Sequence, residues 1–288
     1  MIDFHVHSTA SDGTVEPEEL AKVGLSFGAM ALTDHDNMGG VARFLAESER
    51  LGAGGIRLAG VELSVEPGEG YRQLHMLGLG VDPESPALEM FLARIREGRV
   101  ERNREMCAKL ARMGYAFEES ELQKYAGGEV VARPHIARVM MDHGWVASVQ
   151  EAFERFLQTG APAYVPRRRP SQNEAIAAIH EAGGIAVLAH PRYWTDDQAR
   201  LRLGLARLGE MGLDGVEAVY QANAPEETVD HLRAAKEAGL VVTAGSDFHG
   251  ANKPSVKLGM SVADEDSFLA PVVEALKSRR SFSAAVPE

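Results

Sequence analysis

Residues 239–249 read GLVVTAGSDFH, which is a glycine, a short apolar run, and then an aspartate and a histidine. A similar unit occurs at 28–36, GAMALTDHD, and at 184–190, GIAVLAH. A short apolar run after a glycine that can end a helix is typical of a buried strand entered from a helix. The repeated unit therefore predicts an α/β protein whose strands end in polar, chemically active side chains.

The same reading extends to the rest of the chain and gives seven strand candidates. They lie at 2–7, 29–33, 56–65, 72–81, 185–190, 213–220 and 240–246. Glycines that could end the preceding helices are Gly28, Gly55, Gly184, Gly212 and Gly239. Such steps suit a barrel or an open parallel sheet. Residues 83–166 are helical in pattern instead, so we expect an α/β domain, either barrel or open sheet, formed by 1–82 and 167–288 with an inserted helical cap subdomain at 83–166.

Composition excludes several classes of protein. The 288 residues are 45% hydrophobic and 25% charged, as in a globular protein that buries a core. No apolar run is long enough for a membrane helix and the first residues lack the features of a signal peptide, so we expect a cytoplasmic protein with no membrane partner. A net charge of −12 argues against binding to long DNA. The single cysteine, Cys107, provides neither a disulfide framework nor a thiolate cluster.

Imidazoles and carboxylates recur at or near the strand ends. His5 and His7 are two residues apart in one strand, so both side chains project from the same face. Unpaired charges in such apolar surroundings would cost several kcal/mol, so shared cations are implied. The nine candidate metal ligands are His5, His7, Asp12, His35, Glu62, His75, His190, Asp247 and His249.

This ligand set indicates the kind of metal. Six imidazoles and three carboxylates without a thiolate favour Zn²⁺, Mn²⁺ or Fe²⁺ over Ca²⁺ or Mg²⁺. Nine ligands are too many for one ion and suit two or three. Such ions leave a positive pocket in an acidic protein, which favours an anionic substrate such as a phosphate ester.

The ordered motifs resemble those of the PHP (polymerase and histidinol phosphatase) family. They are His5-x-His7, Thr33-Asp34-His35, the isolated Glu62, His75 and His190, and GSDFH at 245–249. The resemblance implies a distorted (β/α)7 barrel with a trinuclear, manganese-type site at its strand ends. It implies a first metal on His5, His7, Glu62 and Asp247, a second on Glu62, His75 and His190, and a third on Asp12, His35 and His249.

Part of the inserted segment narrows the resemblance. VARPHIAR at 131–138 looks like the arginine and histidine element of the PHP subgroup that hydrolyses nucleoside 3′,5′-bisphosphates, some of which also trim short RNA from the 5′ end. We therefore expect a metal-dependent phosphatase in which a metal-bridging hydroxide attacks the 3′-phosphate and Arg133 and His135 assist. Further substrate-binding candidates are Arg99, Arg102, Asn103 and Arg192. The run of three arginines at 167–169 is typical of a solvated hinge.

Three alternatives stay open at this point. A histidinol-phosphate phosphatase would use the same metals on another substrate. A non-catalytic, metal-stabilised PHP module would bind the ions without turnover. A metal amidohydrolase shares the HxH start, but it usually requires a bridging lysine, and no strand candidate ends in one.

Overall fold

The computed structural model describes residues 1–125 and 133–283. By their internal contacts these residues form two compact units. The first consists of Met1–Phe91 and the described residues from Pro170 onward, and the second consists of the described residues within Leu92–Arg169. Within the described residues, no helix combines the length and the apolar character that a membrane span needs.

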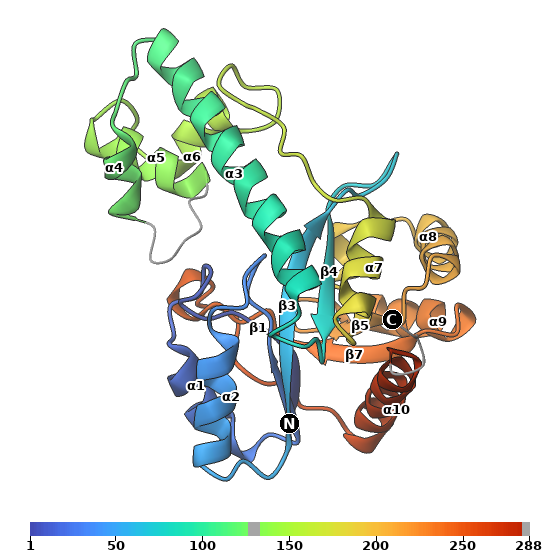
Figure 1. Ribbon diagram of the computed structural model, residues 1–288. Helices are drawn as coiled ribbons and strands as arrows, with labels where there is room; N and C mark the ends of the chain where they lie inside the picture. Colours follow the sequence, from blue (N-terminus) through green and yellow to red (C-terminus); the bar gives the residue numbers. More distant parts are fainter. Residues whose placement is uncertain (126–132, 284–288) are drawn as a thin grey trace. The chain divides into compact units, whose positions relative to one another are not determined.

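A seven-stranded, nearly closed barrel forms the first unit (Figure 1). Its strands are β1 (Ile2–Val6), β2 (Ala29–Leu32), β3 (Ile56–Val65), β4 (Leu74–Leu79), β5 (Ile185–Leu188), β6 (Gly215–Tyr220) and β7 (Val241–Gly245). They are paired in sequence order, and all seven match predicted strands. β4 runs antiparallel to both β3 and β5, whereas the other pairs are parallel. The distortion of the barrel is thus one reversed strand, which follows β3 without an intervening helix.

β1 and β7 meet at the carboxyl ends of the strands. The amide of Asp247 donates to the carbonyl of His5 at 2.9 Å, and the amide of His7 donates to that of Phe248 at 3.0 Å. Lower down, the buried Asp3 carboxylate accepts from the Ser246 amide at 3.0 Å and its hydroxyl at 2.6 Å. A side chain thereby satisfies backbone groups that a regular ladder would pair, and the carboxyl ends of the first and last strands are held together.

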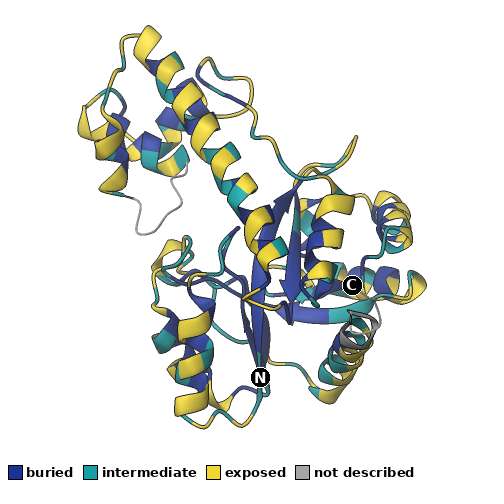
Figure 2. Ribbon diagram, viewed as in Figure 1, coloured by how far each residue is buried: buried dark blue, intermediate teal, exposed yellow. Residues whose placement is uncertain are grey.

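Helices cover the outside of the barrel, with their exposed faces turned outward (Figure 2). They are α1 (Pro17–Val23), α2 (Val41–Arg50), α7 (Gln172–Glu181), α8 (Gln198–Glu210), α9 (Pro225–Glu237) and α10 (Asp266–Ser283). Gly212 and Gly239 follow α8 and α9 with φ of +101° and +67°, as expected of helix-ending glycines. After α2 and α7 the left-handed residues are instead Gly52 and Gly183, so Gly55 and Gly184 do not end these helices.

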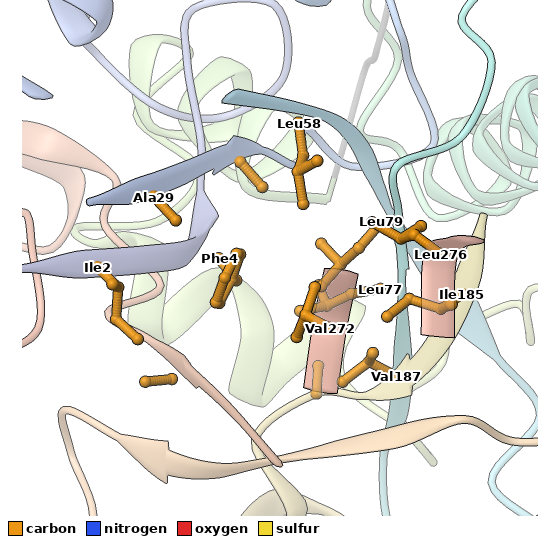
Figure 3. Packing of buried hydrophobic residues seen from close by; sticks show 13 residues of the cluster. Ile2, Phe4, Ala29, Leu58, Leu77, Leu79, Ile185, Val187, Val272 and Leu276 are labelled. Carbon is orange, nitrogen blue, oxygen red and sulfur yellow. The ribbon is translucent and has the colours of Figure 1, made fainter. Parts of the chain in front are cut away.

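Apolar side chains pack inside the barrel (Figure 3), and most of them lie towards the end opposite the metal-ligand candidates. Phe4, Leu58, Leu77 and Val187 belong to one buried cluster, which contains residues from six of the seven strands. Helix α10 contributes Val272 and Leu276 to the same cluster. Burial of these side chains supplies most of the driving force for this unit, and it leaves the polar side chains gathered at the other end.

The second unit has its own core. Helix α3 (Pro86–Arg112) begins in the first unit and continues through the second, followed by α4 (Glu119–Gln123), α5 (Arg133–Asp142) and α6 (Val149–Ala152). Met106, Leu110, Ile136 and Leu157 belong to its buried cluster. Val131 and Ala132 of the predicted arginine and histidine element lie outside the described residues. That this unit serves as a cap stays a prediction.

Candidate metal centre

All nine predicted ligands come from the first unit, at or near the same end of its strands. His5 and Glu62 lie in β1 and β3, whereas His35, His190 and Asp247 follow β2, β5 and β7. His75 is near the start of β4, and this places it with the others because β4 is antiparallel. Barrel topology therefore gathers candidate ligands that are up to 244 residues apart in the sequence, from His5 to His249.

Glu62 lies at the centre of the cluster, with its side chain 1% exposed. Its Oε2 is 3.2 Å from Nε2 of both His5 and His7 and 3.0 Å from Nδ1 of His35. Its Oε1 is 2.7 Å from Nδ1 of His75 and 3.0 Å from Nε2 of His190. One carboxylate thus faces two groups of imidazoles through its two oxygens, which is the arrangement of a bridging metal ligand.

The other two carboxylates extend the cluster. Asp247 Oδ1 is 3.4 Å from His7 Nε2 and 3.3 Å from His249 Nδ1. Asp12 Oδ1 is 3.1 Å from His249 Nε2. Three sets have ligand atoms within 4.8 Å of one another: His5, His7, Glu62 and Asp247; His7, Asp12, His35 and His249; and His35, Glu62 and His75. His190 joins them through its contact with Glu62.

Buried atoms in this cluster lack hydrogen-bond partners. They include His5 Nε2, both ring nitrogens of His7, His35 Nδ1 and Glu62 Oε2. Buried polar atoms without partners cost about 1–3 kcal/mol each in the absence of a ligand. Because they are the nitrogen and oxygen donors that divalent metals take, the residues present fit metal ions.

The electrostatics agree with this interpretation. Burial alone would lower the pKa of His7, but the neighbouring carboxylates of Asp247, Glu62 and Asp12 raise it to about 9. Burial opposes ionisation of Glu62 as well, yet the charges of His35, His5 and His75 hold the pKa of its carboxyl well below the usual range. The carboxylates therefore stay ionised and favour cationic partners, whether protons or metals.

Backbone strain concentrates at the same place. Among the described residues, the non-glycine residues with positive φ are Asp36 (+50°), His190 (+27°) and Asp247 (+60°). Two of these are ligand candidates and the third follows His35. Such conformations cost about 1–3 kcal/mol each and persist where the surrounding structure fixes them, so the fold holds these side chains in the cluster against a local backbone preference.

Carboxylates behind the ligands orient them. Glu217, fully buried in β6, places Oε1 3.0 Å from His5 Nδ1, and its Oε2 accepts from the His190 amide at 2.7 Å. This fixes the Nδ1–H tautomer of His5 and leaves Nε2 for a metal. Asp34 accepts from the Ser8 amide at 2.8 Å and the Ser11 hydroxyl at 2.5 Å, and thereby holds the loop that leads to Asp12.

Sequence reasoning missed the residues on the other side of Asp247. Its Oδ2 accepts from the Tyr220 hydroxyl at 2.9 Å and from Lys253 Nζ at 2.6 Å. Tyr220 ends β6, where its position at a strand end was a usable signal. Lys253 comes from a loop without a motif. It lines, with the metal-ligand candidates, a pocket of about 270 Å³.

Three arginines of the second unit lie near enough to Arg102 to act on its charge. We define Arg99, Arg102, Arg133 and Arg167 as the arginine cluster; the first three are substrate-binding candidates. Arg102 is 7% exposed. Burial first, and then the charges of Arg133, Arg99 and Arg167, lower its pKa to about 9. Asn103, the residue after Arg102, is also buried. His135 lies in the first turn of α5. Arg167, expected in a solvated hinge, thus contributes charge to the cluster.

Arg192 lies apart from these arginines in sequence and belongs to the first unit. Its guanidinium is 3.4 Å from Glu227 and 5.8 Å from the centre of the Tyr193 ring. It is absent from the lining of the 270 Å³ pocket, which includes its neighbour Tyr193. A direct contact of Arg192 with the substrate stays a prediction.

Comparisons with known proteins agree with the geometry. A family model described as the PHP domain matches residues 3–158. A 3′,5′-nucleoside bisphosphate phosphatase of Chromobacterium violaceum is 34% identical over 261 residues, 90% of each chain. The 5′-3′ exoribonuclease Rnm of Escherichia coli K12 is 32% identical over 249 residues, 86% of this chain and 84% of the relative. A crystal structure from Bifidobacterium adolescentis, described as a candidate metal-dependent phosphoesterase, superposes with a TM-score of 0.77 at 29% identity, covering 96% of both chains.

Proposed function

This chain belongs to the PHP domain family, and from that premise we propose that it removes the 3′-phosphate of nucleoside 3′,5′-bisphosphates to give nucleoside 5′-monophosphates. It is a phosphoric ester hydrolase, and trimming of short RNA from the 5′ end is part of the proposal. The observation that carries the proposal is Glu62, whose two oxygens face five imidazoles, from His5, His7, His35, His75 and His190.

We assign two or three divalent ions to the nine ligands, with Mn²⁺ first and Zn²⁺ or Fe²⁺ as alternatives. When bound, such ions lower the pKa of water and offset the charge that develops on phosphoryl oxygens. Glu62 is shared between the two groups of imidazoles, and Glu217 keeps His5 in the tautomer that presents Nε2. Asp247 supplies a third carboxylate beside His7 and His249. The protein's own part is to hold these donors in place before the substrate arrives.

The arginine cluster supports a substrate with a second phosphate. The charges of neighbouring guanidinium groups lower the pKa of Arg102, and a bound dianion would relieve the repulsion between them. Arg133 is suited to this because guanidinium binds phosphate through two parallel hydrogen bonds. In the proposal, Arg102 and Arg133 bind the 5′-phosphate, Arg99 and Asn103 assist, and His135 donates to a phosphate or leaving oxygen.

The first experiment measures phosphate release by Mn²⁺-loaded protein from adenosine 3′,5′-bisphosphate, histidinol phosphate and 5′-AMP, with a chelated control. We expect preference for the bisphosphate and loss of release on chelation. Preference for histidinol phosphate would keep the chemistry and overturn the substrate. Metal binding that raises the melting temperature without any cleavage would favour the non-catalytic module.

A pair of variants on one helix tests the arginine cluster. Arg102→Met removes a buried guanidinium, whereas Arg104→Met removes an exposed one two residues away on α3. We expect Arg102→Met to raise KM for the bisphosphate at least about tenfold, the cost of a lost charged hydrogen bond. Arg104→Met should behave as the wild type. Equal KM values for the two variants would remove the cluster from the substrate site.

A further inference from the structure

Lys253 is a cation at the metal centre that the ligand assignment does not use. Its Nζ lies 2.6 Å from Asp247 Oδ2, and its side chain is 41% exposed. It lines the 270 Å³ pocket together with His35, His75 and His249. The ammonium group therefore reaches the same open space as the candidate metal ligands.

The segment before Lys253 is anchored to the loop that carries Asp12. Asn252 donates to the Asp12 carbonyl at 2.7 Å, and the Ala251 amide donates to the Thr14 hydroxyl at 2.8 Å. Pro254 follows and narrows the backbone conformations open to Lys253, whose φ is −131° and ψ is 71°. The lysine thus starts from a fixed backbone position, which reduces the entropy lost when a ligand is bound.

Asp247 leaves part of the ammonium available. Its Oδ2 also accepts from the Tyr220 hydroxyl at 2.9 Å, so this oxygen keeps a donor without the lysine. An ammonium group has three N–H donors. Within the described residues, the Asp247 contact is the one hydrogen bond of Lys253 Nζ, which leaves two donors for a ligand in the pocket.

We propose that Lys253 binds an oxygen of the phosphoryl group that is hydrolysed, and of the inorganic phosphate that is released, while one N–H stays on Asp247. This rests on the proposed function, because it assumes a phosphate ester in the 270 Å³ pocket. The lysine adds a positive charge at the pocket wall that does not depend on which metal is loaded. It therefore contributes to affinity for a phosphate dianion.

The test is calorimetric titration of inorganic phosphate into metal-loaded wild type and the variants Lys253→Met, Lys253→Arg and Lys257→Met. Lys257 is an exposed lysine of the same loop and is the matched control. Metal content of each protein is measured in parallel. We expect Lys253→Met to keep its metal and bind phosphate about tenfold more weakly, Lys253→Arg to recover most of the affinity, and Lys257→Met to match the wild type.

Two results would overturn the proposal. Unchanged phosphate affinity in Lys253→Met at full metal content would show that the lysine does not contact phosphate. Loss of metal from Lys253→Met, with unchanged phosphate affinity once metal is saturating, would show that it only positions Asp247. A wild type that binds phosphate through Lys253 but cleaves no bisphosphate would leave this inference intact and refute the proposed substrate instead.

Discussion

Substitution of Glu217 by glutamine tests whether a residue behind the ligands controls metal binding. In the wild type, one carboxylate accepts from His5 Nδ1 at 3.0 Å and from the His190 amide at 2.7 Å. Glutamine keeps the shape but has a single acceptor oxygen, so its NH2 group must face one of the two donors. One buried N–H then loses its partner, or His5 changes tautomer and protonates the nitrogen that faces Glu62.

The structure sets the size of the effect. An unsatisfied buried donor costs about 1–3 kcal/mol, and loss of a carboxylate behind a metal-ligating histidine typically costs about 10–100-fold in metal affinity. The two estimates agree, because about 1.4 kcal/mol corresponds to a factor of ten. We therefore expect Glu217→Gln to bind Mn²⁺ or Zn²⁺ about 10–100-fold more weakly, with activity restored in part by excess metal.

The assay is titration calorimetry with either metal, together with urea unfolding of the metal-free proteins. Glu226→Gln on the exposed face of α9 is the matched control and should bind metal as the wild type does. Wild-type metal affinity in Glu217→Gln, with a folded protein, would refute the argument that His5 depends on this carboxylate. A loss confined to stability, without a change in metal affinity, would do the same.

Three further predictions concern pH, packing and the base of the barrel. Folding raises the pKa of His7 from 6.5 to about 9. Its contribution to the stability of the metal-free protein, up to about 3 kcal/mol, is therefore complete below pH 6.5 and is lost as the pH rises towards 9. Urea unfolding at several pH values measures this loss, and metal affinity should rise across the same pH window. Gly245→Ala places a Cβ 2.0 Å from Glu217 Oε1 and 2.5 Å from His5 Cβ, so Glu217 must be displaced. Metal content and melting temperature should both fall as a result. A normal metal content would contradict this displacement. Asp214→Asn weakens contacts to Arg279, to His180 at 2.8 Å and to the Ala186 amide at 2.8 Å. The free energy of unfolding should therefore fall by about 1–3 kcal/mol while kcat stays unchanged. A changed kcat would contradict a purely structural role for Asp214.

Local sequence pattern was enough to predict the strands and the candidate metal ligands. Short apolar runs that follow a glycine are short-range signals, so seven strands could be predicted with errors only at their ends. His5, His7, Asp247 and His249 stand beside or within apolar runs, where their cost without a partner can be inferred from the neighbours alone. The position of the helix-ending glycine was less certain, since Gly52 and Gly183 take the left-handed conformation in place of nearby Gly55 and Gly184.

Strand direction and long-range contacts could not be predicted in the same way. A short apolar run reads the same in both directions, so the reversal of β4, which places His75 beside Glu62, depends on how the whole barrel closes. Lys253 shows the same limit, because its loop has no motif and its role depends on contact with Asp247.

The sequence by itself therefore determined the fold class and the set of candidate metal-binding donors, because both depend on residue type and near neighbours. Tertiary structure alone decided that Glu62 lies at the centre of five imidazoles, that Glu217 orients His5 from 212 positions away, and that Lys253 reaches the pocket. The physical reason is that these contacts form between strand ends and loops that meet only when hydrophobic burial closes the barrel.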